Sequence, residues 1–98
     1  MTEVYNTYDK GDSVRLGATF TVSDVNTDPT TVTLKVKNPA GVTSTYTYGA
    51  AEITKSATGI YYKDITVTDD GMYYYRFEGT GTCVAASEHG FEVRKSEF

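Results

Sequence analysis

The sequence predicts an all-β fold, and three observations lead to this prediction. Thr, Val and Tyr crowd the chain while Leu is scarce, and β-branched and aromatic residues fit a pleated, half-buried surface. Several segments alternate apolar and polar residues, which is typical of strands with one buried face. Turn residues separate these segments at intervals of roughly 8 to 12 residues. Since 98 residues suffice for one core, residues 1–98 are expected to form a single β-sandwich domain.

Composition and charge argue against several classes of protein. The net charge of −4 leaves no basic face for phosphates, so we expect no nucleic acid partner. One cysteine and one histidine cannot make an intramolecular disulfide or a Cys/His zinc site, and no cofactor is expected. The first twenty residues hold no apolar stretch of signal-peptide length, and no apolar run is long enough to span a bilayer. We therefore expect synthesis in the cytoplasm and no membrane partner.

Residues 1–56 contain five expected strands. A weak strand opens the chain at residues 3–8, and the most regular alternation follows at residues 13–22. The apolar face of this second strand is formed by Val14, Leu16, Ala18, Phe20 and Val22. Residues 31–37 and 42–48 are strands of a hairpin joined by an Asn-Pro-Ala-Gly turn, and residues 52–56 form a short edge strand.

The second half contains three expected strands. In residues 60–67, Tyr61, Ile65 and Val67 share one face with Lys63, so we expect Lys63 to bury its stem and keep its ammonium in water. Residues 72–78 place Tyr73, Tyr75 and Phe77 on the inner face and Met72, Tyr74, Arg76 and Glu78 on the outer face. Residues 79–86 are expected to be a loop, and Phe91 and Val93 mark a last strand.

A short motif gives the sandwich a more specific form. Asp69, Gly71, Tyr73 and Tyr75 stand at alternate positions, and D-x-G-x-Y-x-(C) resembles the entry to strand F of immunoglobulin domains. The resemblance makes Tyr73 the candidate for the tyrosine corner of that fold, with Asp69 and Gly71 in the turn before it. Tyr75 stands at the cysteine position and the chain has no Trp, so the antibody-type core is missing. The prediction is an Ig-like antiparallel β-sandwich of seven to eight short strands. The alternative interpretation of the motif itself is a simple turn before an aromatic strand.

A wider resemblance covers most of the chain. It rests on the runs YDKGDSVRLGATFTV, DPTTVTLKVKNPAG, SATGIYYKDITV, DDGMYYYRFEGTG and GFEVRKSEF. Together these look like small Ig-like proteins encoded among the virion genes of tailed bacteriophages and prophages. The resemblance implies a structural protein of the particle, as a head decoration or a head–tail (neck) accessory, that binds phage capsid or connector proteins. It also implies synthesis in the host cytoplasm, location in the virion and many copies on a symmetric assembly.

Two sets of polar residues are candidates for chemical sites. Cys83, Glu88 and His89 supply a nucleophile, an acid and a base close together in sequence, but no oxyanion-hole signature accompanies them and a small sandwich has little room for a pocket. We expect no enzyme, with Cys83 half-buried and His89 in a loop. Asp24, Asn26 and Asp28 have the spacing that opens an EF-hand calcium loop. Pro29 and Lys35 stand where that loop needs Gly and Glu, so an ordinary strand connection is favoured and no metal site is expected.

Tyrosine is the most informative excess, with nine residues and no Trp. Tyrosine supplies large contact area at low entropy cost, so exposed tyrosines indicate a binding surface. Tyr74 and Tyr62 face outward on strands of opposite sheets. Tyr46 and Tyr48 either join Tyr74 on one outer face or cap the core, and these three residues are the candidate interface.

Three classes of function follow from these observations. The favoured class is a non-enzymatic structural protein of a tailed phage particle. The alternative is an Ig-like binding module that stacks exposed tyrosines on a carbohydrate or binds a receptor on the host surface. A small enzyme is the third class, and it requires a pocket that the sequence does not indicate.

Overall fold

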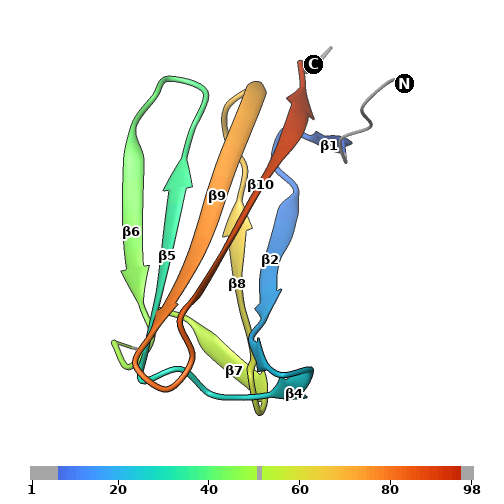
Figure 1. Cartoon of the computed structure of the whole chain (residues 1–98). Helices are drawn as coiled ribbons and strands as arrows, with labels where there is room; N and C mark the ends of the chain where they lie inside the picture. The colour runs from blue at the N-terminus through green and yellow to red at the C-terminus, as the bar shows by residue number, and fades with distance from the viewer. Residues whose placement is uncertain (1–6, 51, 96–98) are drawn as a thin grey trace, which may run out of the picture.

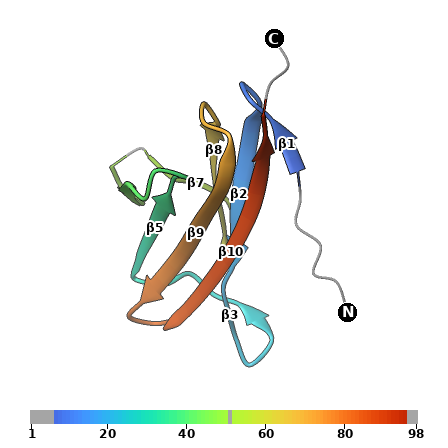
Figure 2. The same ribbon diagram turned by 90° about the horizontal axis from the view of Figure 1, so that it is seen from above.

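The fold is a sandwich of two β-sheets, described here from a computed structural model for residues 7–50 and 52–95 (Figures 1 and 2). The larger sheet has the strand order β1 (Thr7–Asp9), β10 (Ala85–Arg94), β9 (Gly71–Thr80), β5 (Thr31–Lys37) and β6 (Thr43–Thr47). The smaller sheet has the order β2 (Ser13–Thr19), β8 (Ile60–Thr66) and β7 (Thr54–Ala57). A two-stranded hairpin of β3 (Thr21–Val22) and β4 (Val25–Asn26) follows β2.

The strand order is that of an immunoglobulin domain, and the prediction of an all-β sandwich is confirmed. β2, β8 and β7 take the places of strands B, E and D, while β10, β9, β5 and β6 take those of G, F, C and C′. All neighbouring strands are antiparallel except β1, which pairs in parallel with β10. No helix long and apolar enough to cross a membrane occurs in the residues described.

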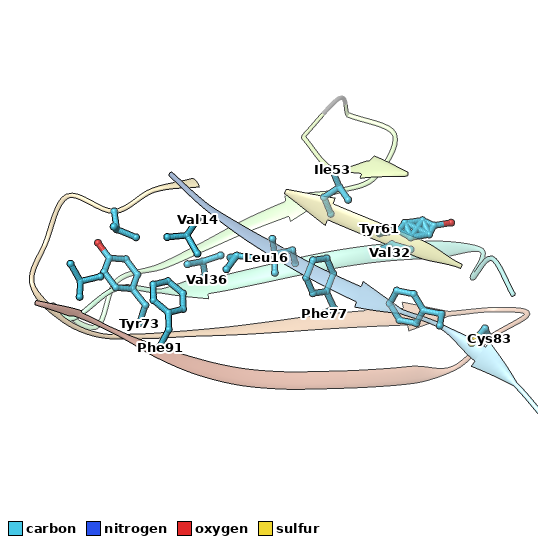
Figure 3. Close-up of a cluster of buried hydrophobic side chains, with 14 residues drawn as sticks. Val14, Leu16, Val32, Val36, Ile53, Tyr61, Tyr73, Phe77, Cys83 and Phe91 are labelled. Atoms are coloured by element: carbon cyan, nitrogen blue, oxygen red, sulfur yellow. The ribbon is translucent and has the colours of Figure 1, made fainter. Parts of the chain in front are cut away.

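The core lies between the two sheets and contains side chains from both (Figure 3). Its largest fully buried side chains are Tyr61, Phe77, Leu16 and Leu34. β9 is central because it pairs with β10 on one side and with β5 on the other, and Tyr73 and Phe77 point from it into the core. Aromatic rings meet edge to face within the core, as between Phe20 and Tyr61 at 5.8 Å.

The expected strand at residues 13–22 is too long. β2 ends at Thr19, and Phe20 is the last residue whose side chain is buried. Thr21 and Val22 instead pair with β4, and Val22 is 44% exposed rather than inward. The cause is the two-residue turn at Ser23 and Asp24, whose φ values of 50° and 65° are those of a type I′ hairpin turn.

The expected loop at residues 79–86 is also wrong. β9 continues to Thr80 and β10 begins at Ala85, with Gly79 opposite Ala85 in the ladder. The glycine at position 79 reflects packing rather than a loop, because a Cβ there would lie 2.8 Å from Pro29 and 2.9 Å from Phe20. His89 therefore lies within β10, and Cys83 is buried at 2% exposure rather than half-buried.

The remaining elements lie close to their expected positions. The short edge strand, expected at residues 52–56, is β7 (Thr54–Ala57), and Ile53 before it is buried in the core. Lys63 faces inward opposite Leu16, is half-buried, and holds its ammonium 4.5 Å from the centre of the Tyr46 ring. Residues 3–6 of the expected first strand lie outside the described residues.

Candidate functional site

The turn that leads into β9 is held by a buried tyrosine. Tyr73 is 5% exposed, and its hydroxyl oxygen accepts a hydrogen bond of 3.2 Å from the backbone amide of Asp69. Its ring stacks on Phe91 at 5.2 Å with an interplanar angle of 4°. Gly71 adopts a φ of 123°, and a Cβ there would lie 2.9 Å from Pro39. The side-chain hydroxyl of Tyr73 is thus hydrogen-bonded to backbone upstream in the chain, as in a tyrosine corner.

Tyr74 lies on the opposite, outer face of the same strand. It is 47% exposed, and its register partners are Lys37 on β5 and Gly90 on β10. A Cβ on Gly90 would lie 3.0 Å from Cδ1 and 3.1 Å from Cε1 of the Tyr74 ring. The ring therefore lies directly against the Gly90 backbone, which restricts its rotation while one side stays in solvent.

A shallow hollow of about 180 Å³ adjoins Tyr74 on this outer face. Its charged lining residues are Lys35, Lys37, Arg76 and Glu88. Glu78 pairs with Lys35 at 2.9 Å and with Arg76 at 3.7 Å, and the bond from Lys35 lowers the pKa of Glu78. We call Tyr74, Lys35, Lys37 and Arg76 the Tyr74 patch, an aromatic surface of mixed charge whose cations lie beside Glu78 and Glu88.

Tyr46 and Tyr48 do not join this patch. Tyr46 pairs with the buried Leu34, and the backbone of Tyr48 bonds to that of the buried Val32, so both face the core side of the larger sheet. Tyr46 packs partly buried against the core, and the Tyr48 ring meets Tyr61 edge to face at 5.1 Å. Of the three candidate interface residues, only Tyr74 lies on the outer face.

Cys83, Glu88 and His89 do not converge. The buried Cys83 thiol points to the backbone oxygen of Thr21 at 3.6 Å, whereas Glu88 lies on the outer face within 3.6 Å of Arg76. His89 is on the other side of β10, where its Nε2 lies 2.9 Å from the hydroxyl of Ser87. The three groups cannot act on one substrate in this arrangement.

Asp28 makes hydrogen bonds that stabilise the fold. Its carboxylate accepts hydrogen bonds from the Lys55 ammonium at 2.6 Å, the Gly59 amide at 2.7 Å and the Tyr61 hydroxyl at 3.1 Å. The bond from Lys55 is the main reason that the pKa of Asp28 is lowered, and burial is the main reason that the pKa of Tyr61 rises to about 12. Asp24 is exposed in the β3–β4 turn, and the described residues contain no group of three or more ligating side chains that could hold a metal ion.

A second hollow, of about 430 Å³, adjoins β2. It is lined by Gly17, Ala18 and Thr19 of β2, by Tyr62 of β8, and by Ser87 and His89 of β10, among others. Arg15 lies 4.0 Å above the Tyr62 ring and makes two hydrogen bonds to Asp64, at 2.8 and 3.1 Å.

Sequence reasoning identified Tyr74 but missed its support and the second hollow. Gly90 stands one residue before the buried Phe91, and an isolated glycine within a strand indicates close approach of another group. That signal was present in the sequence but did not name Tyr74 as the group. Comparison of the chain with protein-family models, with curated proteins and with solved structures finds no match.

Proposed function

We propose that this chain is a non-enzymatic structural protein of a tailed bacteriophage particle, as a head decoration or a head–tail accessory. In this proposal it is made in the host cytoplasm, resides in the virion and binds capsid or connector proteins. The likeness of its sequence to small Ig-like virion proteins supports the proposal, and so does the Ig-like order of its strands. Such a protein needs a surface that binds other proteins.

The observation that carries the proposal is the exposed Tyr74 ring lying against Gly90. Tyrosine is enriched among the few residues that dominate protein–protein binding energy. A ring whose rotation is already restricted loses little conformational entropy on binding. The cations of the Tyr74 patch, with Glu78 and Glu88 beside them, would set which partner surface fits.

Attachment through so small a patch is weak for one copy. Many copies on a symmetric shell strengthen it, because each further contact of a linked array forms at high effective concentration. The isolated domain is then expected to bind a single partner subunit poorly and an assembled particle well.

The test adds tagged protein to particles that lack it and measures co-sedimentation. Wild type is expected to sediment with the particles, and Tyr74→Ala is expected to lose most of this binding while keeping its stability. Tyr48→Ala is the matched control, since Tyr48 lies on the inner face and its loss lowers stability without changing the Tyr74 patch. It is assayed at a temperature at which it remains folded.

Two results together would remove the proposal: wild type binds no particle, and purified virions do not contain the chain. A glycan array then tests the competing class, a module that binds carbohydrate or a host receptor. Binding to a glycan that is lost in Tyr74→Ala or Tyr62→Ala would support that class instead.

A further inference from the structure

β2 is a free edge of the smaller sheet. Its only strand partner among the described residues is β8, which lies beside it in Figure 1. The register runs from Ser13 opposite Thr66 to Thr19 opposite Ile60. β2 has seven residues and no register shift in this ladder. An edge of this length and regularity can template pairing with a further strand.

The backbone groups that β2 turns to this free side can be assigned. Phe20 donates to the Gly59 carbonyl at 2.7 Å, and Val67 donates to the Asp12 carbonyl at 3.0 Å, which fixes the even-numbered residues as those bonded to the β8 side. Bonded and non-bonded residues alternate in an antiparallel ladder. The amides and carbonyls of Ser13, Arg15, Gly17 and Thr19 therefore point away from β8, and within the described residues nothing bonds to them.

The edge strands β1, β7 and β6 are shorter than β2 and carry features that limit such pairing. β1 has three residues, and β7 has four with a register shift and a lysine. On β6, the Thr47 amide donates to the Glu52 carboxylate at 3.3 Å, and the Thr47 carbonyl accepts from Ala50 at 3.3 Å. β2 is thus a long open edge, as are residues 85–91 of β10, which have no partner on their second side among the described residues.

A hollow adjoins this edge. The hollow of about 430 Å³ is lined by Gly17, Ala18 and Thr19 of β2 and by Ser87 and His89 of β10. Ser56, Ile60, Tyr61 and Tyr62 on the β8 side line it too, so only part of it lies beside the edge. β1 pairs only with residues 92–94 of β10, so β10 has no second strand partner among the described residues beside Ser87 and His89. Because Gly17 has no side chain and Ala18 only a methyl group, the side chains of β2 leave the approach open.

We propose that the β2 edge binds an extended segment of another protein by β-strand addition. The segment pairs with Ser13, Arg15, Gly17 and Thr19. The backbone donors and acceptors of these residues lie at regular spacing, and an extended chain is the ligand that can bond to all of them. Its alternate side chains point inward, where Ala18 and Tyr75 are only partly buried, so the segment is apolar at every second position. This inference does not depend on the particle proposal.

The probe is a set of nine-residue peptides selected from a random displayed library against the immobilised full chain. Selected peptides are expected to alternate apolar and polar residues. N-methylation of a peptide is expected to weaken binding at every second residue and to have little effect at the residues between, because only alternate amides face β2. Binding is also expected to slow hydrogen exchange at the amides of Arg15, Gly17 and Thr19.

Thr19→Pro removes one outward amide and is expected to lower peptide affinity by about tenfold or more. Thr43→Pro is the matched control, because it makes the same change at the first residue of the β6 edge and is expected to leave affinity unchanged. Circular dichroism checks that both variants fold. If Thr19→Pro does not fold, the N-methylation and exchange patterns of wild type decide.

Three outcomes would overturn the inference. One is the absence of selected peptides, or binding without the period of two. Another is that the amides of Arg15, Gly17 and Thr19 are already protected in the full chain and lose protection when residues 1–6 are deleted, which makes the chain itself the occupant. The third is that protection appears with concentration-dependent dimerisation, which makes a second copy the occupant.

Discussion

Tyr73 and Tyr74 are adjacent on β9 and serve different purposes. Tyr73 is buried, stacks on Phe91 and anchors the turn through Asp69. Tyr74 is half exposed and rests on Gly90. Since a strand turns successive side chains to opposite faces, a one-residue error in register would exchange these roles.

The first prediction compares these two residues. Tyr73→Phe should lower the free energy of unfolding by about 1 kcal/mol, because it removes one hydrogen bond. Tyr73→Ala should lower it by roughly 3 to 5 kcal/mol, because it also leaves a cavity. Tyr74→Ala should cost less than Tyr73→Ala. Urea unfolding measures all three, and equal costs for the two alanine variants would contradict the register.

The second prediction concerns acid stability and Asp28. The pKa of Asp28 is lowered in the folded chain, chiefly by its bond from Lys55, so ionised Asp28 stabilises the fold above its unfolded pKa of about 3.9. That contribution is lost as pH falls through the lower folded pKa. Asp28→Asn should therefore be less stable than wild type at pH 7, and the difference should shrink below pH 4. Urea unfolding at several pH values measures this, and a difference independent of pH would exclude the role.

At the scale of the element, two glycines at turns show how tightly the strands are joined. Gly59, between β7 and β8, has a φ of 76°, and a Cβ there would lie 2.6 Å from the Phe20 carbonyl oxygen and 2.9 Å from the Thr27 amide nitrogen. Gly49, after β6, has a φ of 104° with no atom within 4 Å of such a Cβ. One turn is packed against backbone and the other faces open space.

The third prediction follows from that contrast. Gly49→Ala should cost about 1 to 2 kcal/mol, the strain of a left-handed residue with a side chain. Gly59→Ala should cost clearly more, because the backbone of Phe20 and Thr27 must also move. Thermal and urea unfolding give the ordering, and equal costs would show that the β7–β8 turn is free to adjust.

The strands that sequence alone predicted well are those with one buried face. Residues 31–37 and 60–67 alternate cleanly, and β5 and β8 match them to within a residue. Alternation continued through residues 13–22 as well, but the Ser23–Asp24 turn diverts the chain before the pattern ends. Residues 79–86 look like a loop because Gly79 is needed for packing against Pro29 and Phe20, which are distant in sequence.

The candidate site was predicted only in part, because some of its features also depend on contacts between residues distant in sequence. The outward face of Tyr74 follows from its position between two core residues of β9. The faces of Tyr46 and Tyr48 depend on which residues of β5 they pair with, and the sequence does not specify that register. The free edge of β2 depends on the order of strands in the sheet, which is a property of the whole fold.

For the whole molecule, the fourth prediction concerns what holds the fold together. The core consists of side chains from both sheets, and the single cysteine forms no intramolecular disulfide. The far-UV circular dichroism spectrum should be dominated by β-structure and should not change with reducing agent or EDTA. Helical content above about a quarter of residues would contradict the fold, because the described residues form strands and no helix. Loss of structure in EDTA would show that a metal ion is required.

The parallel pairing of β1 with β10 determines how the domain responds to tension. A pull on the chain before Thr7 and after Arg94 slides these two strands along each other, so the hydrogen bonds between them share the load. An antiparallel pair pulled from its two free ends would open one bond at a time. Arg94 and Asp9 add an ion pair of 2.6 Å across the same two strands. Force applied at the two ends of the domain therefore loads the bonds between β1 and β10 together rather than one after another.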